Sequence, residues 1–415
     1  MSHRRSVALI AYVLCVCAAP ILAQSPQSFQ FTFADKPGPF AVGLHVYHEY
    51  DPSRTFRESS AGSGSATTQG PRPMQILVWY PAENSTKPKM TFGDYETLIR
   101  TETSFDQPTD SGSSQKFVES FMRGTAAQPA WAVRDAPPAV GSFPIVVYAP
   151  SLNAPNTENI ELCEYLATQG YIVVASPSLG ADTRHMTVDL ANANAQAQDI
   201  AFDLHVAGKL PHADPSHTAI IGYSWGGMAA LFAAARDSHI DAFISLDGSF
   251  RYSPALVQQA GDVHPGQMKI PLLVVSRAEE SLESWAAMHQ SSPCQDAPNV
   301  LNQWTHGDLL HIHMLALSHI QFSSLFQRSQ RFKLEGPHFI PADYSLEEGN
   351  ESYNWIARYT LEFLNAYLKQ DPRAIQFLKQ TPAQNGVPSH LMAVSLHPAS
   401  NPPPAVGGSD AGGAK

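Results

Sequence analysis

The chain has 415 residues, of which 43% are hydrophobic and 10% aromatic, so its composition is unlike that of disordered chains. Lys and Arg number 26 against 37 Asp and Glu, and the net charge of −11 argues against nucleic-acid binding, which needs a basic face. This length allows two or three domains, although a single α/β domain with insertions often reaches it.

The first 23 residues are typical of a signal peptide. Arg4 and Arg5 precede an apolar run over residues 7–16, and small residues lead to Ala23. The apolar run is shorter than the roughly 20 residues that a spanning helix needs, and no later segment sustains such a length. We therefore expect a secreted or periplasmic protein without a stable membrane span.

Two cysteines remain after removal of that peptide, Cys163 and Cys294. An oxidising compartment would allow them to pair, although two separate buried thiols are the simpler expectation. At the other end, residues 395–415 are rich in Pro and Gly and predict a disordered tail. We expect one catalytic domain over residues 26–385.

The first part of that domain predicts a hairpin and an insertion. Apolar, alternating segments at 40–50 and 74–81 flank a stretch rich in Gly, Ser, Thr and Pro at 59–73, as in a hairpin with a long connection. Residues 83–140 fit no strand pattern and contain short helix candidates at 95–101 and 115–122. We expect 83–140 to be a cap or insertion that could roof a site.

From Ile145 onward, short apolar runs alternate with helical segments, which is typical of a parallel sheet with crossover helices. The predicted strands lie at 145–148, 171–175, 219–223, 242–246, 272–276 and 312–317. The predicted helices lie at 158–168, 188–208, 227–236 and 352–369. The fold class is α/β, with a mostly parallel, doubly wound sheet and an insertion before its central strands.

The most informative motif is Gly-Tyr-Ser-Trp-Gly-Gly over residues 222–227. It follows an apolar strand and precedes an Ala-rich helix, the context in which Gly-x-Ser-x-Gly exposes a nucleophilic serine on a tight turn. Small residues on both sides let the strand and the helix approach closely. This pattern predicts that Ser224 is a nucleophile.

A nucleophilic serine needs a histidine base and an acid, in the chain order Ser, acid, His for this fold. Asp247 directly follows the predicted strand 242–246, whereas Glu279 and Glu280 follow the next strand, a commoner place for the acid. His319 and His338 both lie in loops suited to the base. These alternatives stay open at the level of residue pattern, because Asp247 could instead cap a turn.

Several segments resemble the plasma-type platelet-activating-factor acetylhydrolases and the bacterial dienelactone-hydrolase-like serine esterases. The similarity covers most of residues 74–369 and rests on short matches that occur in the same order: LVWYP at 77–81, PIVVYAPSLNA at 144–154, LATQGYIVV at 166–174, GYSWGG at 222–227, LDG at 246–248, IPLLVVS at 270–276 and SHIQFSS at 318–324. The resemblance implies an α/β-hydrolase fold with Ser224 as nucleophile, Asp247 as acid and His319 as base.

The resemblance also implies an oxyanion hole made by the backbone N–H groups of Leu152 and Trp225. In one respect the chain departs from the family, since Pro150 and Ser151 stand where many esterases have His-Gly before the oxyanion residue. Pro150 has no N–H group but is not the expected donor. We therefore expect the hole to be present with an altered shape.

A zinc site is the main competing interpretation of the histidines. His311 and His313 alternate on a strand pattern, with His306 and His319 nearby. Asp308 is the only carboxylate close by in the sequence, and the spacing matches no metal motif. We expect no metal and no cofactor.

These observations predict an exported serine hydrolase of carboxylic esters that acts through an acyl-enzyme, on a small-molecule ester or lipid substrate. The resemblance implies phospholipids or other esters with short acyl groups. Two alternatives stay open: a non-catalytic binding protein on a hydrolase scaffold, favoured by Pro150 and Ser151, and a peptidase or polyester hydrolase with the same triad.

Overall fold

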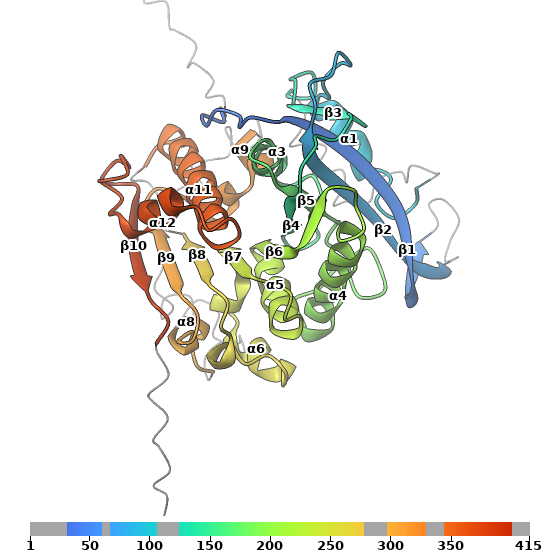
Figure 1. The fold of residues 1–415 in the computed structure, drawn as a ribbon. Coiled ribbons are helices and arrows are strands. Elements are labelled where there is room, and N and C mark those ends of the chain that lie inside the picture. The colour runs from blue at the N-terminus through green and yellow to red at the C-terminus, as the bar shows by residue number, and fades with distance from the viewer. Residues whose placement is uncertain (1–30, 60–66, 106–123, 278–296, 329–343, 401–415) are drawn as a thin grey trace, which may run out of the picture.

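The computed structural model describes residues 31–59, 67–105, 124–277, 297–328 and 344–400. The signal-peptide prediction, the helix candidate at 115–122, Glu279, Glu280, Cys294 and His338 lie outside these residues. Within them, the strands form one ten-stranded sheet in the order β10-β9-β8-β7-β6-β4-β5-β2-β1-β3 (Figure 1).

The centre of the sheet is parallel. It consists of β4 (Phe143–Ala149), β5 (Ile172–Ala175), β6 (Ala213–Tyr223), β7 (Ala242–Leu246), β8 (Leu272–Ser276) and β9 (Leu309–Met314). The strands β4, β5, β7 and β8 are buried along their whole length, which explains their unbroken apolar runs. This arrangement confirms the predicted α/β fold with a mostly parallel sheet.

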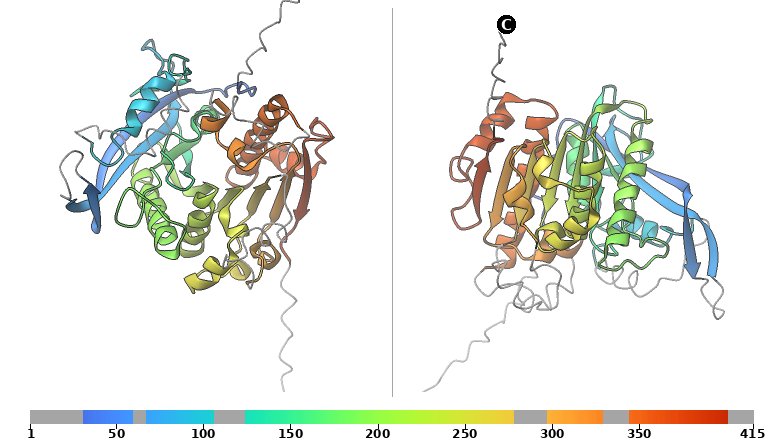
Figure 2. Two further views of the ribbon diagram at one scale, coloured as in Figure 1. Left: turned by 180° about the vertical axis from the view of Figure 1, so that it is seen from behind. Right: turned by 90° about the horizontal axis from the view of Figure 1, so that it is seen from below.

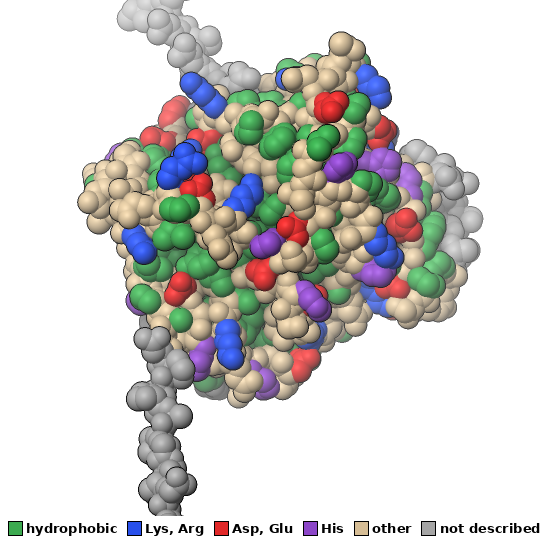
Figure 3. Space-filling model, viewed as in Figure 1, with side chains coloured by type: hydrophobic (Ala, Val, Ile, Leu, Met, Phe, Trp, Pro, Cys, Tyr) green, Lys and Arg blue, Asp and Glu red, His purple; other side chains and the backbone are tan. Residues whose placement is uncertain are grey.

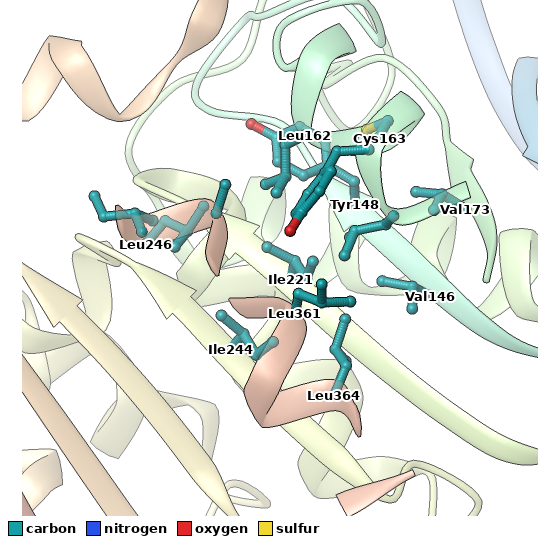
Figure 4. Packing of buried hydrophobic residues seen from close by; sticks show 14 of the residues in the cluster. Val146, Tyr148, Leu162, Cys163, Val173, Ile221, Ile244, Leu246, Leu361 and Leu364 are labelled. Carbon is teal, nitrogen blue, oxygen red and sulfur yellow. The ribbon is translucent and has the colours of Figure 1, made fainter. Parts of the chain in front are cut away.

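Helices cover both faces of the sheet (Figures 1 and 2). Val146 and Tyr148 of β4 pack in a core with α3 (Ile160–Thr168) and α11 (Leu346–Tyr367). Figure 4 shows this core, in which Tyr148 lies beside Leu162 and Cys163 of α3. The alternate residues of β4 pack on the opposite face with α4 (Leu190–Ala207) and α5 (Trp225–Arg236).

The N-terminal hairpin is longer than the sequence predicts. β1 (Ala41–Ser59) and β2 (Thr67–Ala82) pair antiparallel over most of their length, with a register shift between Asp51 and Thr55. The predicted connection at 59–73 is therefore largely wrong, because Thr67 to Pro73 lie in β2. Backbone hydrogen bonds between two strands do not require apolar side chains, so the polar composition concealed this part of the ribbon.

The described part of the segment 83–140 contains α1 (Phe92–Ile99) and the short strand β3 (Ala132–Arg134). β3 pairs parallel with β1 at the edge of the sheet, so the expectation of no strand in this segment was wrong. Three residues are too few to show an alternation in the sequence. The cap role of 83–140 stays a prediction.

The C-terminal boundary also needs correction. β10 (Met392–His397) pairs antiparallel with β9, so the sheet continues past 385 and residues 395–397 do not belong to a disordered tail. The last predicted strand, 312–317, is observed three residues earlier as β9. β10 is an edge strand in which Met392 is buried, Val394 is half-buried and the other side chains are exposed.

Shorter elements complete the fold: η1 (Ser249–Arg251), α6 (Pro254–Ala260), η2 (Pro265–Gln267), α8 (Val300–Gln303), η3 (His319–Phe322), α9 (Ser324–Arg328) and α12 (Pro372–Lys379). No helix among the described residues has the length and apolar character needed to cross a membrane. On the face drawn in Figure 3, acidic and basic side chains are interspersed.

Candidate active site

Ser224 lies at a sharp turn between β6 and α5. Its backbone angles, φ 52° and ψ −118°, are rare for a residue with a side chain and cost about 1 to 3 kcal/mol. Neighbouring backbone groups hold this conformation, since Ser224 N–H donates to Leu246 O (3.0 Å) and Ser224 O accepts from Gly227 N–H (3.0 Å) and Ser249 N–H (2.8 Å). The strained turn projects the hydroxyl away from the strand.

The three glycines of the motif allow backbones to approach closely. A Cβ on Gly222 would lie 2.4 Å from Gly226 O, one on Gly226 would lie 2.1 Å from Ala149 O, and one on Gly227 would lie 2.6 Å from Gly248 Cα. Each distance is shorter than a real side chain tolerates. The motif is thus required sterically by the crossing of β6, α5 and the end of β4.

Ser224, His319 and Asp247 form one hydrogen-bonded chain. The Ser224 Oγ lies 2.9 Å from His319 Nε2, and His319 Nδ1 lies 2.5 Å from Asp247 Oδ2. His319 begins η3, and Asp247 follows β7 with φ 45°. The fold thus joins a hydroxyl, an imidazole and a carboxylate from three separate segments, an arrangement in which the imidazole can take up the serine proton.

Asp247 is held in a fixed orientation by further donors. It is 1% exposed, and its Oδ1 accepts hydrogen bonds from Tyr252 OH (2.7 Å) and Arg277 N–H (3.3 Å). The Arg277 guanidinium, which lies over the Tyr252 ring, approaches Oδ2 at 3.5 Å. Burial by itself raises the pKa of Asp247, but the hydrogen bond and charge of His319, with Arg277 and Tyr252, outweigh burial and lower this pKa. Asp247 is therefore a carboxylate at neutral pH.

Leu152 and Trp225 are the residues whose backbone N–H groups are expected to form the oxyanion hole. Leu152 lies in the loop after β4, and Trp225 is the first residue of α5. Neither backbone N–H donates to another described residue. Pro150, which departs from the family pattern, is held by its carbonyl, which accepts from Gln196 Nε2 at 2.8 Å. An N–H at the start of a helix is a suitable donor to a developing negative charge.

His311 and Asp308, which were considered for a zinc site, have partners outside this group, and the alternative acids Glu279 and Glu280 and the alternative base His338 lie outside the described residues. His311 Nε2 lies 2.8 Å from Ser276 Oγ, and Asp308 accepts from Tyr367 OH at 2.8 Å. Among the described residues, no cluster of three or more His, Cys, Asp or Glu side chains could hold a metal ion. Cys163 is a buried free thiol.

Sequence reasoning missed the contacts of Tyr252 and Arg277 with Asp247. Tyr252 lies five residues after Asp247, and Arg277 directly follows β8, the strand next to β7. A polar residue at the end of a neighbouring parallel strand is a signal that could have pointed to Arg277.

Comparisons with models of protein families and with curated proteins give no match. A comparison with solved structures does: a ferulic acid esterase from Streptomyces cinnamoneus is similar, with a TM-score of 0.57 and 20% sequence identity, over 82% of this chain and 94% of that chain. At this level of identity the likeness concerns the fold. Together with the sheet order and the turn at Ser224, it establishes that this chain has the α/β-hydrolase fold.

Proposed function

We propose that this protein is a serine hydrolase of carboxylic esters, with Ser224 as nucleophile, His319 as general base and Asp247 as the acid that orients His319. The observation that carries the proposal is the continuous hydrogen-bonded chain from Asp247 Oδ2 through His319 to Ser224 Oγ. Structural hydroxyls rarely combine such a chain with a strained backbone at the serine.

In the acylation step, His319 Nε2 takes the Ser224 proton while Oγ attacks the ester carbonyl carbon. The new C–O bond forms as the carbonyl π electrons move to oxygen, and the N–H groups of Leu152 and Trp225 stabilise that oxyanion. Collapse breaks the bond to the leaving alkoxide, which receives the proton from His319. The product is an alcohol and an acyl-Ser224 ester.

In the deacylation step, His319 takes a proton from water, and the resulting hydroxide attacks the acyl carbon. Collapse of the second tetrahedral intermediate returns the proton to Ser224 Oγ and releases the carboxylic acid. Asp247 stays ionised throughout and stabilises the imidazolium of His319, in keeping with its lowered pKa. Ser224, His319 and Asp247, with one water molecule, thus account for both steps of ester hydrolysis.

Two similarities to other proteins support the proposed substrate class, one in sequence and one in structure. The segments shared with platelet-activating-factor acetylhydrolases favour an ester with a short acyl group, including phospholipids. The structural likeness to a protein described as a ferulic acid esterase also favours a carboxylic ester. The basic, apolar and small-residue pattern of residues 1–23 supports export to the periplasm or the medium.

The test is covalent labelling with a fluorophosphonate probe together with hydrolysis of p-nitrophenyl esters of increasing acyl length. The parent protein should be labelled at Ser224, and Ser224→Ala should lose labelling and roughly 10⁴-fold or more of kcat. Ser216→Ala, which removes an exposed hydroxyl at the other end of β6, is the matched control and should behave as the parent.

A folded parent protein that neither reacts with the probe nor hydrolyses any ester would contradict the proposal and favour a binding protein. Faster cleavage of matched p-nitroanilides than of esters would favour a peptidase. A maximum of kcat/KM at acetyl or butyryl esters supports the short-acyl assignment, and a maximum at long chains opposes it.

A further inference from the structure

The loop that carries Leu152 is attached to one buried carboxylate. Ser151 Oγ donates to Glu158 Oε1 at 2.5 Å, and Ser151 N–H donates to Glu158 Oε2 at 2.9 Å. Tyr148 OH, at the end of β4, donates to the same Oε2 at 3.0 Å. The Glu158 carboxylate thus accepts hydrogen bonds from both the side chain and the backbone of Ser151, the residue directly before Leu152.

The segment that contains Glu158 also holds the loop of His319. The Glu158 carbonyl accepts from Ser323 Oγ (3.0 Å) and Leu325 N–H (3.1 Å), which lie just after η3. Its neighbour Asn159 donates to Tyr148 OH at 2.9 Å and to Phe322 O at 3.1 Å. Two adjacent residues therefore connect the loop of Leu152 with the segment of His319.

We infer that Glu158 is a positioning residue. Its ionised carboxylate holds Ser151 and thereby orients the N–H group of the next residue, Leu152, toward the oxyanion. This inference rests on the proposed function. It assigns a role to Ser151, the residue that replaces part of the His-Gly pair: its hydroxyl and its N–H are the two donors that Glu158 accepts. Among the described residues, the carboxylate has hydrogen bonds with Ser151 and Tyr148 and none with Ser224.

The environment of Glu158 makes this role dependent on pH. Glu158 is 1% exposed, and burial raises its pKa to about 7, although hydrogen bonds from Ser151 and Tyr148 and the charge of His319 act in the opposite direction. The other titratable groups that face it are Tyr223 on β6 and Cys163 on α3. Protonation leaves one carboxyl oxygen as a donor, so the two donors of Ser151 can no longer both be accepted.

The experiment compares Glu158→Gln with the parent in hydrolysis of p-nitrophenyl acetate from about pH 5 to about pH 9. Glutamine resembles the protonated carboxyl, because it is neutral and has one acceptor oxygen. Above the pKa of Glu158, kcat should fall roughly 10- to 100-fold with little change in KM, since a misplaced oxyanion donor slows the reaction without weakening ground-state binding. Toward pH 5 the ratio of parent to variant should approach one.

Thr157→Val is the matched control. Thr157 is fully buried next to Glu158, and its hydroxyl has no hydrogen-bond partner among the described residues, so this change of similar volume should leave kcat and its pH profile unaltered. Ser151→Ala is the second variant, used if Glu158→Gln does not fold. It removes one of the two donors to Glu158 and should reduce kcat roughly 3- to 10-fold at high pH. Toward pH 5 the kcat of this variant should also approach that of the parent.

A parent-to-variant ratio that stays constant across the pH range would overturn the inference, because a purely structural role does not depend on ionisation of Glu158. Unchanged kcat in a folded Glu158→Gln protein that still reacts with fluorophosphonate would also overturn it and leave the proposed function intact. Absence of probe reaction in the parent protein would contradict both.

Discussion

Replacement of Asp247 by Asn tests the proposed acid with almost no change in volume. Three groups converge on Asp247 as donors: His319 Nδ1–H, Tyr252 OH and the backbone N–H of Arg277. An amide offers one acceptor oxygen and one NH₂ donor, so it cannot satisfy donors on both sides. With its NH₂ toward His319, two N–H groups would meet across the present distance of 2.5 Å.

The imidazole can relieve this conflict by moving its proton from Nδ1 to Nε2. It then accepts from the amide but no longer accepts the Ser224 proton, so the base is lost in its ground state. The imidazolium that forms in the transition state also loses its carboxylate. Loss of the orienting acid reduces kcat by about 10³ to 10⁴, which corresponds to about 4 to 5.5 kcal/mol at 1.36 kcal/mol for each factor of ten.

The assay is steady-state hydrolysis of p-nitrophenyl acetate with circular dichroism to verify the fold. Glu279→Gln and Glu280→Gln serve as comparisons and should each retain activity close to that of the parent. The reasoning is refuted if Asp247→Asn, folded, turns over within about tenfold of the parent. A glutamate variant without activity would place the acid after the later strand instead.

His319→Ala should abolish both ester hydrolysis and fluorophosphonate labelling, whereas His338→Ala should retain both; the opposite pattern would assign the base to His338. Gly226→Ala should lower the free energy of unfolding by about 2 kcal/mol or more in urea titration, because its Cβ would lie 2.1 Å from a backbone oxygen. Gly70→Ala, with open space at this position, should be tolerated, and equal stability of the two variants would contradict the packing argument. Burial lowers the pKa of His311 from 6.5 to about 4, so the unfolded chain binds a proton that the folded protein excludes, and stability should fall as pH drops through this window. In urea titrations of His311→Gln, the free energy of unfolding should therefore fall less between about pH 7 and about pH 5 than it does in the parent. An equal fall in the variant and the parent would contradict this prediction.

The sequence alone determined the fold class and the position of Ser224. Continuous apolar runs separated by helices specify buried parallel strands, since each such strand must be covered on both faces. The turn at Ser224 could be recognised because its constraint is local: glycine is needed wherever a Cβ would meet a backbone atom a few residues away, as between Gly222 and Gly226.

The strands at the two edges of the sheet could not be predicted from residue type in the same way. β3 has only three residues and β10 exposes most of its side chains, and both are held by backbone hydrogen bonds to a neighbouring strand at an edge of the sheet. The polar end of the β1–β2 ribbon was missed for the same reason. Pairing of backbone groups leaves almost no trace in residue type.

Residue pattern left the partner of the candidate base open, because Asp247 and the two glutamates each follow a strand. Only the tertiary structure brings Asp247 within 2.5 Å of His319, 72 residues away in the chain, and surrounds it with Tyr252 and Arg277. The contact of Glu158 with Ser151 likewise depends on how one loop folds over the start of α3. Local sequence specifies which groups can donate or accept a proton, whereas their distances and burial depend on the packing of segments that are remote in sequence.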